Sequence, residues 1–161
     1  MESARRAAAG ICAGLPQQIQ DVMWGPDSVN DAHTQGALTL AACTLCEWCP
    51  MRSMCLAEAI IVHDQYGVRG GLPVKARREL ARIARADGVK VDDRSLAAAS
   101  RLARWIGKHP ESVAQAYRIY RGKEGRRKLT ARQRRWREKT RRPTPSGPAS
   151  PPAPTQTLFD D

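Results

Sequence analysis

Hydrophobic and polar residues recur along much of the chain with the spacing of amphipathic α-helices. The side chains that share one helical face within residues 54–65 are Leu56, Ala59, Ile60 and His63. This segment predicts a helix that stops before Gly67. A second helix is expected from about Lys75 to Ala86, ended by Gly88. The pattern favours an all-α fold.

Two more helices are expected in residues 91–121. Asp93 is a suitable N-cap for the first, and Gly107 a suitable stop. Its apolar positions include Leu96, Ala99, Ala103 and Ile106. Pro110 suits the first position of the next helix, which has one face formed by Val113, Ala116, Tyr117 and Tyr120. The pair predicts a helical hairpin, either packed on the preceding domain or acting as a helix-turn-helix.

A glycine-rich segment separates the first two helices. Residues 67–71 contain Gly67, Gly70 and Gly71, together with Val68 and Arg69, and Pro73 follows. Three glycines in five residues indicate a tight turn with positive φ or a close approach of the backbone. No Gly-Lys-Ser/Thr follows, so the segment is not a phosphate-binding loop.

The composition indicates a thin hydrophobic core. Aromatic residues are 5% of the 161 residues, with a single phenylalanine, Phe159. Small domains with thin cores usually need a disulfide, a metal or a partner for stability. The chain is therefore expected to have such a stabilising element.

The net charge of +11 is concentrated in one segment. Residues 121–142 carry twelve Lys or Arg against two acids, whereas the remainder is almost neutral. A basic arm of this kind favours a polyanion as partner, with nucleic acid the leading candidate and with RNA as an alternative to DNA. The expected DNA-binding residues are Arg126, Arg127, Lys128, Arg132, Arg134 and Arg135. Thr130 is expected to cap a short helix, and residues 143–161, rich in proline, to form a disordered tail.

Five cysteines lie within the first 55 residues of the chain. Three of them form a C-x2-C-x5-C pattern: Cys46, Cys49 and Cys55. Cys43 lies three residues before Cys46, and Cys12 lies far upstream. The apolar stretch after the N-terminal arginines is too short for a secretion leader, and no run would span a membrane, so a cytoplasmic location is expected. Clustered cysteines there favour metal binding. Crowded thiolates favour an iron–sulfur cluster, with structural zinc as the alternative.

The remaining residues do not indicate an enzyme. There is no Ser/His/Asp grouping and no pair of carboxylates with catalytic spacing among residues 1–161. A thiol–disulfide oxidoreductase using Cys46 and Cys49 stays as a further alternative.

Two motifs resemble the WhiB-like family of transcription regulators. Residues 46–56, CEWCPMRSMCL, resemble the family's C-x-x-C-P-V-R-x-x-C-L core. Residues 66–73, YGVRGGLP, are similar to its G-V-W-G-G-L turn, and residues 77–80 take the place of its E-R-R-x-L helix start. The resemblance covers residues 11–80, about half of the chain.

Members of this family are actinobacterial and actinophage regulators that hold a [4Fe–4S] cluster through four cysteines. The resemblance implies that Cys46, Cys49 and Cys55 are ligands and that Cys12 matches the distant fourth position, with Cys43 as the alternative. It also implies a small helical domain wrapped around the cluster, DNA binding, and a response to redox change or nitric oxide. The expected organisation is a cluster domain at 11–80, a helical hairpin at 91–121, a basic DNA-binding arm at 121–142 and a tail at 143–161.

The chain departs from the family pattern at Arg69. The family has Trp at this position, as an apolar anchor that faces the RNA polymerase sigma factor. Arginine does not fill an apolar slot, although it stacks or pairs with acids. This departure argues against sigma-factor binding in the family's form and is typical of a divergent member, such as a phage-encoded one.

Overall fold

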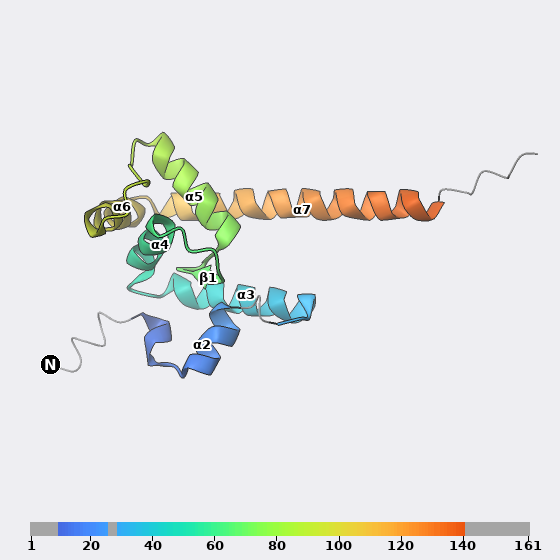
Figure 1. The fold of residues 1–161 in the computed structure, drawn as a ribbon, viewed down its shortest axis with the longest axis horizontal. Helices are drawn as coiled ribbons and strands as arrows, with labels where there is room; N and C mark the ends of the chain where they lie inside the picture. Colours follow the sequence, from blue (N-terminus) through green and yellow to red (C-terminus); the bar gives the residue numbers. More distant parts are fainter. Residues whose placement is uncertain (1–9, 26–28, 141–161) are drawn as a thin grey trace, which may run out of the picture. The chain divides into compact units, whose positions relative to one another are not determined.

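The structure is a computed structural model that describes residues 10–25 and 29–140. It confirms the all-α prediction, with one very small sheet (Figure 1). The elements are η1 (Ile11–Gly14), α2 (Gln17–Trp24), α3 (Ala32–Glu47), α4 (Arg52–Ile61), β1 (Val68–Arg69), β2 (Leu72–Pro73), α5 (Val74–Ala86), α6 (Leu96–Lys108) and α7 (Pro110–Thr140). The chain divides into two compact units, Met1–Gly125 and Arg126–Asp161.

Helices α3 and α4 carry three of the cysteines. Asp31 caps α3 by accepting a hydrogen bond from the backbone N–H of Thr34 at 2.7 Å. Helix α4 ends at Ile61, four residues before the predicted end, because His63 takes a left-handed φ of 56°. The N–H of Asp64 then bonds to the carbonyl of Ala59, which closes the helix end. His63 is exposed and does not belong to the apolar face, so that part of the prediction was wrong.

The glycine-rich segment forms the predicted tight turn. Strands β1 and β2 pair antiparallel, with Val68 opposite Pro73 and Arg69 opposite Leu72. Gly70 and Gly71 connect them with φ angles of 53° and 81°. Two consecutive positive φ angles define a hairpin turn of the type that matches strand twist, and glycine adopts them without a Cβ clash.

The main core lies between α4, α5 and α6. Its largest fully buried side chains include Leu56, Ile61, Leu72, Leu80 and Leu102. Helix α6 packs chiefly on α4 through small residues such as Ala98 and Ala99, rather than forming an isolated hairpin with α7. Ser95, not Asp93, is the N-cap of α6, and Leu96 is 75% exposed rather than in the core.

Helix α7 begins at Pro110, as predicted, and continues without interruption to Thr140. Val113 and Ala116 are buried in the core. The arm was expected to be a separate short helix beginning at Thr130, but Thr130 lies inside α7 and donates to the carbonyl of Arg126. The many Arg, Lys, Gln and Glu residues favour helix strongly enough to offset Gly122 and Gly125. The expected tail, residues 143–161, lies outside the described residues.

Candidate metal centre and basic surface

Four of the five cysteines line one small cavity. They are Cys12, Cys46, Cys49 and Cys55, and all five cysteines are free thiols. Cys43 does not line this cavity. The structure therefore brings together the four residues that the resemblance implies, with Cys12 rather than Cys43 as the fourth.

Each of the four thiols comes from a different local structure. Cys12 lies in the 3-10 turn η1, Cys46 in the last turn of α3, and Cys55 in the first turn of α4. Cys49 lies in the connection, where its N–H bonds to the carbonyl of Cys46 at 3.2 Å and its own carbonyl accepts from Arg52 at 3.1 Å. Pro50 has no N–H to donate and favours the break between the two helices.

Hydrogen-bond donors surround two of the sulfurs. The indole N–H of Trp24, a buried side chain of α2, donates to Sγ of Cys46 at 3.3 Å. Burial raises the pKa of Cys46, while this bond and the backbone N–H of Gly71 oppose the rise. Burial likewise raises the pKa of Cys55, opposed first by the backbone N–H of Gly70. N–H donors aimed at sulfur stabilise its anionic, ligand form.

The charge around the cavity suits an anionic group. Arg52 and Arg69 are the charged residues that line it, and no Asp or Glu among the described residues does so. Four cysteine thiolates around an iron–sulfur core carry a net negative charge. Two guanidinium groups and several N–H donors oppose that charge, so the donor set and its surroundings fit such a cluster.

The fifth thiol, Cys43, has a structural environment instead. It is buried beside Trp24, Ala42 and Val68 and hydrogen-bonds with the hydroxyl of Tyr117 on α7. Burial, and then the neighbouring Cys46, raise the pKa of Cys43 to about 11. Such a thiol stays protonated at neutral pH and packs as a small hydrophobic group.

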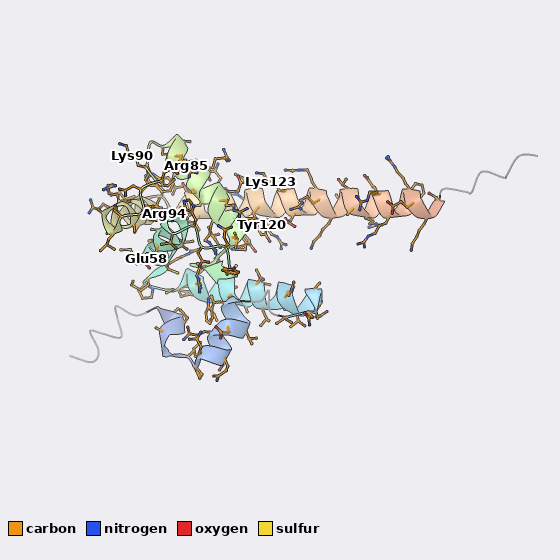
Figure 2. The ribbon with its side chains drawn as sticks, viewed as in Figure 1. Glu58, Arg85, Lys90, Arg94, Tyr120 and Lys123 are labelled. Atoms are coloured by element: carbon orange, nitrogen blue, oxygen red, sulfur yellow. The ribbon has the colours of Figure 1, made fainter. Side chains whose placement is uncertain are left out.

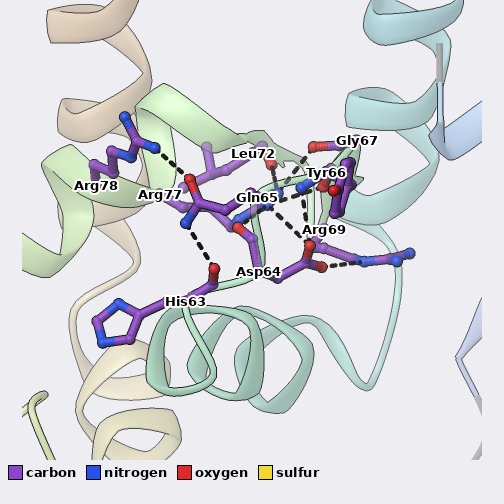
Figure 3. A network of polar contacts seen from close by, with 9 residues as sticks. All are labelled: His63, Asp64, Gln65, Tyr66, Gly67, Arg69, Leu72, Arg77 and Arg78. Atoms are coloured by element: carbon purple, nitrogen blue, oxygen red, sulfur yellow. Dashed lines mark hydrogen bonds and ion pairs between the residues drawn. The ribbon is translucent and has the colours of Figure 1, made fainter. Parts of the chain in front are cut away.

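A buried arginine on α5 holds the turn beside the cavity. Arg77 is 3% exposed and donates to four backbone carbonyls, those of Asp64, Tyr66, Gly67 and Leu72, at 2.9–3.0 Å (Figure 3). Asp64 pairs with Arg69 at 2.9 Å and lies 4.0 Å from Arg77. Burial would raise the pKa of Asp64, but the Tyr66 N–H and Arg69 outweigh it and lower that pKa. The turn is thereby fixed against α5.

Sequence reasoning missed three residues of this site. Trp24 and Arg52 contact the cysteine cavity, and Arg77 fixes the turn. Arg52 lies inside the cysteine motif and Arg77 inside the helix-start motif, so both were present in the segments that carried the resemblance. No spacing signal marks Trp24, which reaches Cys46 across 22 residues of sequence.

The expected DNA-binding residues lie on α7, in the second compact unit. Arg126, Arg127, Lys128, Arg132, Arg134 and Arg135 are all exposed. Within residues 126–140, one face is formed by Lys128, Arg132, Arg135 and Lys139, spaced four, three and four residues apart. Leu129 and Trp136 lie at its edge, and Trp136 is 65% exposed. A different face pairs Arg134 with Glu138 at 3.6 Å.

Two properties of residues 10–25 and 29–140 concern single metal ions and membranes. No three His, Cys, Asp or Glu side chains there meet closely enough to hold a single metal ion. None of the helices there combines the length and the apolar character needed to cross a bilayer.

Comparison with known proteins gives one family match. Residues 8–80 match the family model of the transcription factor WhiB, a range that contains all five cysteines and the glycine-rich turn. No curated protein and no solved structure matches the chain. Residues 8–80, just under half of the chain, thus carry the match to the WhiB-like family of transcription factors.

Proposed function

We propose that the protein is a WhiB-like transcription regulator that holds a [4Fe–4S] cluster through Cys12, Cys46, Cys49 and Cys55 and binds DNA through the basic part of α7. One observation carries the cluster assignment. Four thiols from four separate local structures line one cavity, and the two charged residues there are arginines. The fold alone does not require thiols to converge in this way.

When bound, the cluster would supply a redox-active centre that oxygen or nitric oxide can attack. The chain's own residues hold and shield it. Trp24, Gly70 and Gly71 direct N–H groups at two of the four sulfurs, and Arg77 keeps the turn in place. Reduced thiols of this kind belong to a cytoplasmic protein.

The two alternatives from the sequence are less well supported. Structural zinc sites usually draw on two separated Cys/His pairs, whereas Cys46, Cys49 and Cys55 lie within ten residues of one another. A thiol–disulfide oxidoreductase needs an exposed thiol with a lowered pKa, whereas Cys46 is buried with a raised one.

Anaerobic purification with iron, sulfide and zinc analysis tests the cluster. The wild type should bind about four irons and absorb broadly in the visible blue, as all-cysteine four-iron clusters do. Cys43→Ser should keep this content, because Cys43 lies outside the cavity, and Cys12→Ser should lose it. A colourless protein with one zinc, or iron loss only in Cys43→Ser, would contradict the proposal.

The DNA-binding part of the proposal rests on the basic face of α7. Four cations along one face, with an exposed indole at its edge, suit the phosphate backbone of a duplex. Among the described residues, none of the four cations of this face, Lys128, Arg132, Arg135 and Lys139, forms an ion pair with an acid. The face therefore remains available to a polyanion.

Fluorescence anisotropy of labelled duplex DNA against salt tests this face. The test variant has Gln at the four positions of this face, Lys128, Arg132, Arg135 and Lys139. The steepness with which the logarithm of the DNA association constant falls with the logarithm of the salt concentration should decrease by about 3 to 4. The matched control changes Arg126, Arg127, Arg134 and Arg137 to Gln, which removes the same charge from other faces. Equal losses in both variants would refute a specific DNA-binding face, and no loss in either would refute DNA binding by α7.

A further inference from the structure

Arg69 lies where three hollows of the first compact unit meet. It lines the four-cysteine cavity together with Cys12 and Cys55. It also lines a hollow of about 600 Å³ beside α4 and the start of α6, which reaches Cys55. A third hollow of about 390 Å³, beside α2 and the turn, contains both Arg69 and Cys12. A solute entering either larger hollow therefore meets Arg69 next to a cysteine.

The charge of Arg69 is only partly compensated. Its carboxylate partner Asp64, 2.9 Å away, is shared with the buried Arg77 at 4.0 Å, so the three groups together keep a positive charge. Figure 3 shows the Arg69 side chain extending past Asp64, away from Arg77. The guanidinium is thus held in place. Its uncompensated charge lies at the cysteine cavity, which no described acid lines, whereas Glu58 and Asp21 line the two larger hollows.

Arg69 is also the outer of the two arginines in the cavity. Arg52 donates to the carbonyl of Gly70 at 3.2 Å and is partly buried. The side chain of Arg69 is 48% exposed. Glu58 and Arg94, labelled in Figure 2, line the 600 Å³ hollow but not the cysteine cavity. Arg69 is therefore the cation that an incoming small molecule meets beside the thiols.

We propose that Arg69 is a cationic entrance residue that makes the cysteine-bound cluster react faster with anionic small oxidants than with cationic ones. This inference rests on the proposed cluster. A positive charge at the entrance raises the local concentration of anions and lowers that of cations.

Two outer-sphere oxidants of opposite charge test the proposal on the cluster-loaded protein. Each takes one electron from the cluster and forms no bond to it: ferricyanide goes from a trianion to a tetraanion, and tris(phenanthroline)cobalt(III) goes to cobalt(II). Loss of visible absorbance in a stopped-flow instrument gives the rate. Iron and sulfide content, measured first, shows that the cluster is present.

At low ionic strength, Arg69→Gln should slow bleaching by ferricyanide about 3- to 10-fold and speed bleaching by the cobalt complex. Arg69→Lys should stay close to the wild type. The control Arg94→Gln removes a cation from the same hollow but not from the cysteine cavity, and should change either rate less than about 2-fold.

The salt dependence gives a second measurement. Added salt should slow ferricyanide and speed the cobalt complex in the wild type, and both trends should be weaker in Arg69→Gln, because the charge of the rest of the chain is the same in the two proteins. Equal changes for both oxidants in Arg69→Gln, or the same salt trends in the wild type and Arg69→Gln, would overturn the inference. A wild type without iron would instead refute the proposed function.

Discussion

At the scale of single residues, the turn depends on the buried guanidinium of Arg77. We expect Arg77→Met to lower the free energy of unfolding by about 3 kcal/mol or more, because four carbonyls lose their charged donor. The neighbouring Arg78, which is exposed, provides the control Arg78→Met, expected to cost below about 1 kcal/mol. Urea unfolding followed by circular dichroism measures both. Equal losses would show that the carbonyl network is not what stabilises the turn.

Gly67 tests how closely the turn must approach α2. Its φ is 51°, and a Cβ there would collide with the backbone carbonyl of Trp24. Gly88 has a similar φ of 80° with open space around it. Gly88→Ala should cost about 1 to 2 kcal/mol from the left-handed backbone alone. Gly67→Ala should cost clearly more in the same urea experiment, and equal costs would exclude the collision as the reason.

The cysteines that line the cavity show how far residue-level prediction reached. Spacing and resemblance selected Cys46, Cys49 and Cys55 and left Cys12 and Cys43 as alternatives. Only the positions of η1 and α3 distinguish Cys12 from Cys43 as the fourth cysteine of the cavity. Cys12 on η1 lines the cavity, whereas Cys43 on α3 lies against Tyr117. Local sequence does not encode such positions, because they follow from packing between distant segments.

At the scale of secondary structure, helix ends were predicted well where glycine closes the helix and poorly elsewhere. Helix α5 ends at Ala86, followed by Gly88 in the left-handed region, as predicted. Helix α4 uses His63 for the same purpose. A non-glycine residue in this conformation is uncommon, so the pattern pointed to the next glycine instead.

Ion pairs tie α7 to α5 within the first compact unit. Lys75 pairs with Glu124 at 2.6 Å, and Lys123, labelled on α7 in Figure 2, pairs with Glu79. The hydrogen bond from Lys123 lowers the pKa of Glu79 from its ordinary value of 4.5. A carboxyl with a lowered folded pKa stabilises the fold above that value, and the contribution is lost as the pH falls below it.

This contribution predicts a pH dependence of stability. The free energy of unfolding should fall as the pH drops below about 5.5, through 4.5 and on toward the lowered pKa of Glu79, and it should fall less in Glu79→Gln, which has no carboxyl to titrate. Urea unfolding at several pH values gives the two curves, and their difference isolates Glu79 from other carboxyls. Parallel curves would mean that Glu79 does not stabilise the docked α7.

At the scale of the whole molecule, the charge is divided as the sequence predicts. Ten Lys or Arg residues lie in residues 126–142, beyond the compact unit that ends at Gly125. A stop after Gly125 should lower the slope of log K against log salt for duplex DNA by about 4 or more. The iron content should stay that of the full chain, because every proposed ligand precedes the stop. Unchanged DNA binding would place the DNA contact elsewhere.

The sequence by itself determined the elements whose signals are local. Apolar periodicity marked the helices, paired glycines marked the hairpin turn, and charge density marked the basic arm. Tertiary structure alone decided which thiol joins the cavity, that α6 packs on α4, and that Arg77 and Trp24 support the site. The physical reason is distance along the chain. Helix and turn preferences act over a few residues, whereas the cavity joins segments from Cys12 to Gly70, whose approach depends on burial of the whole core.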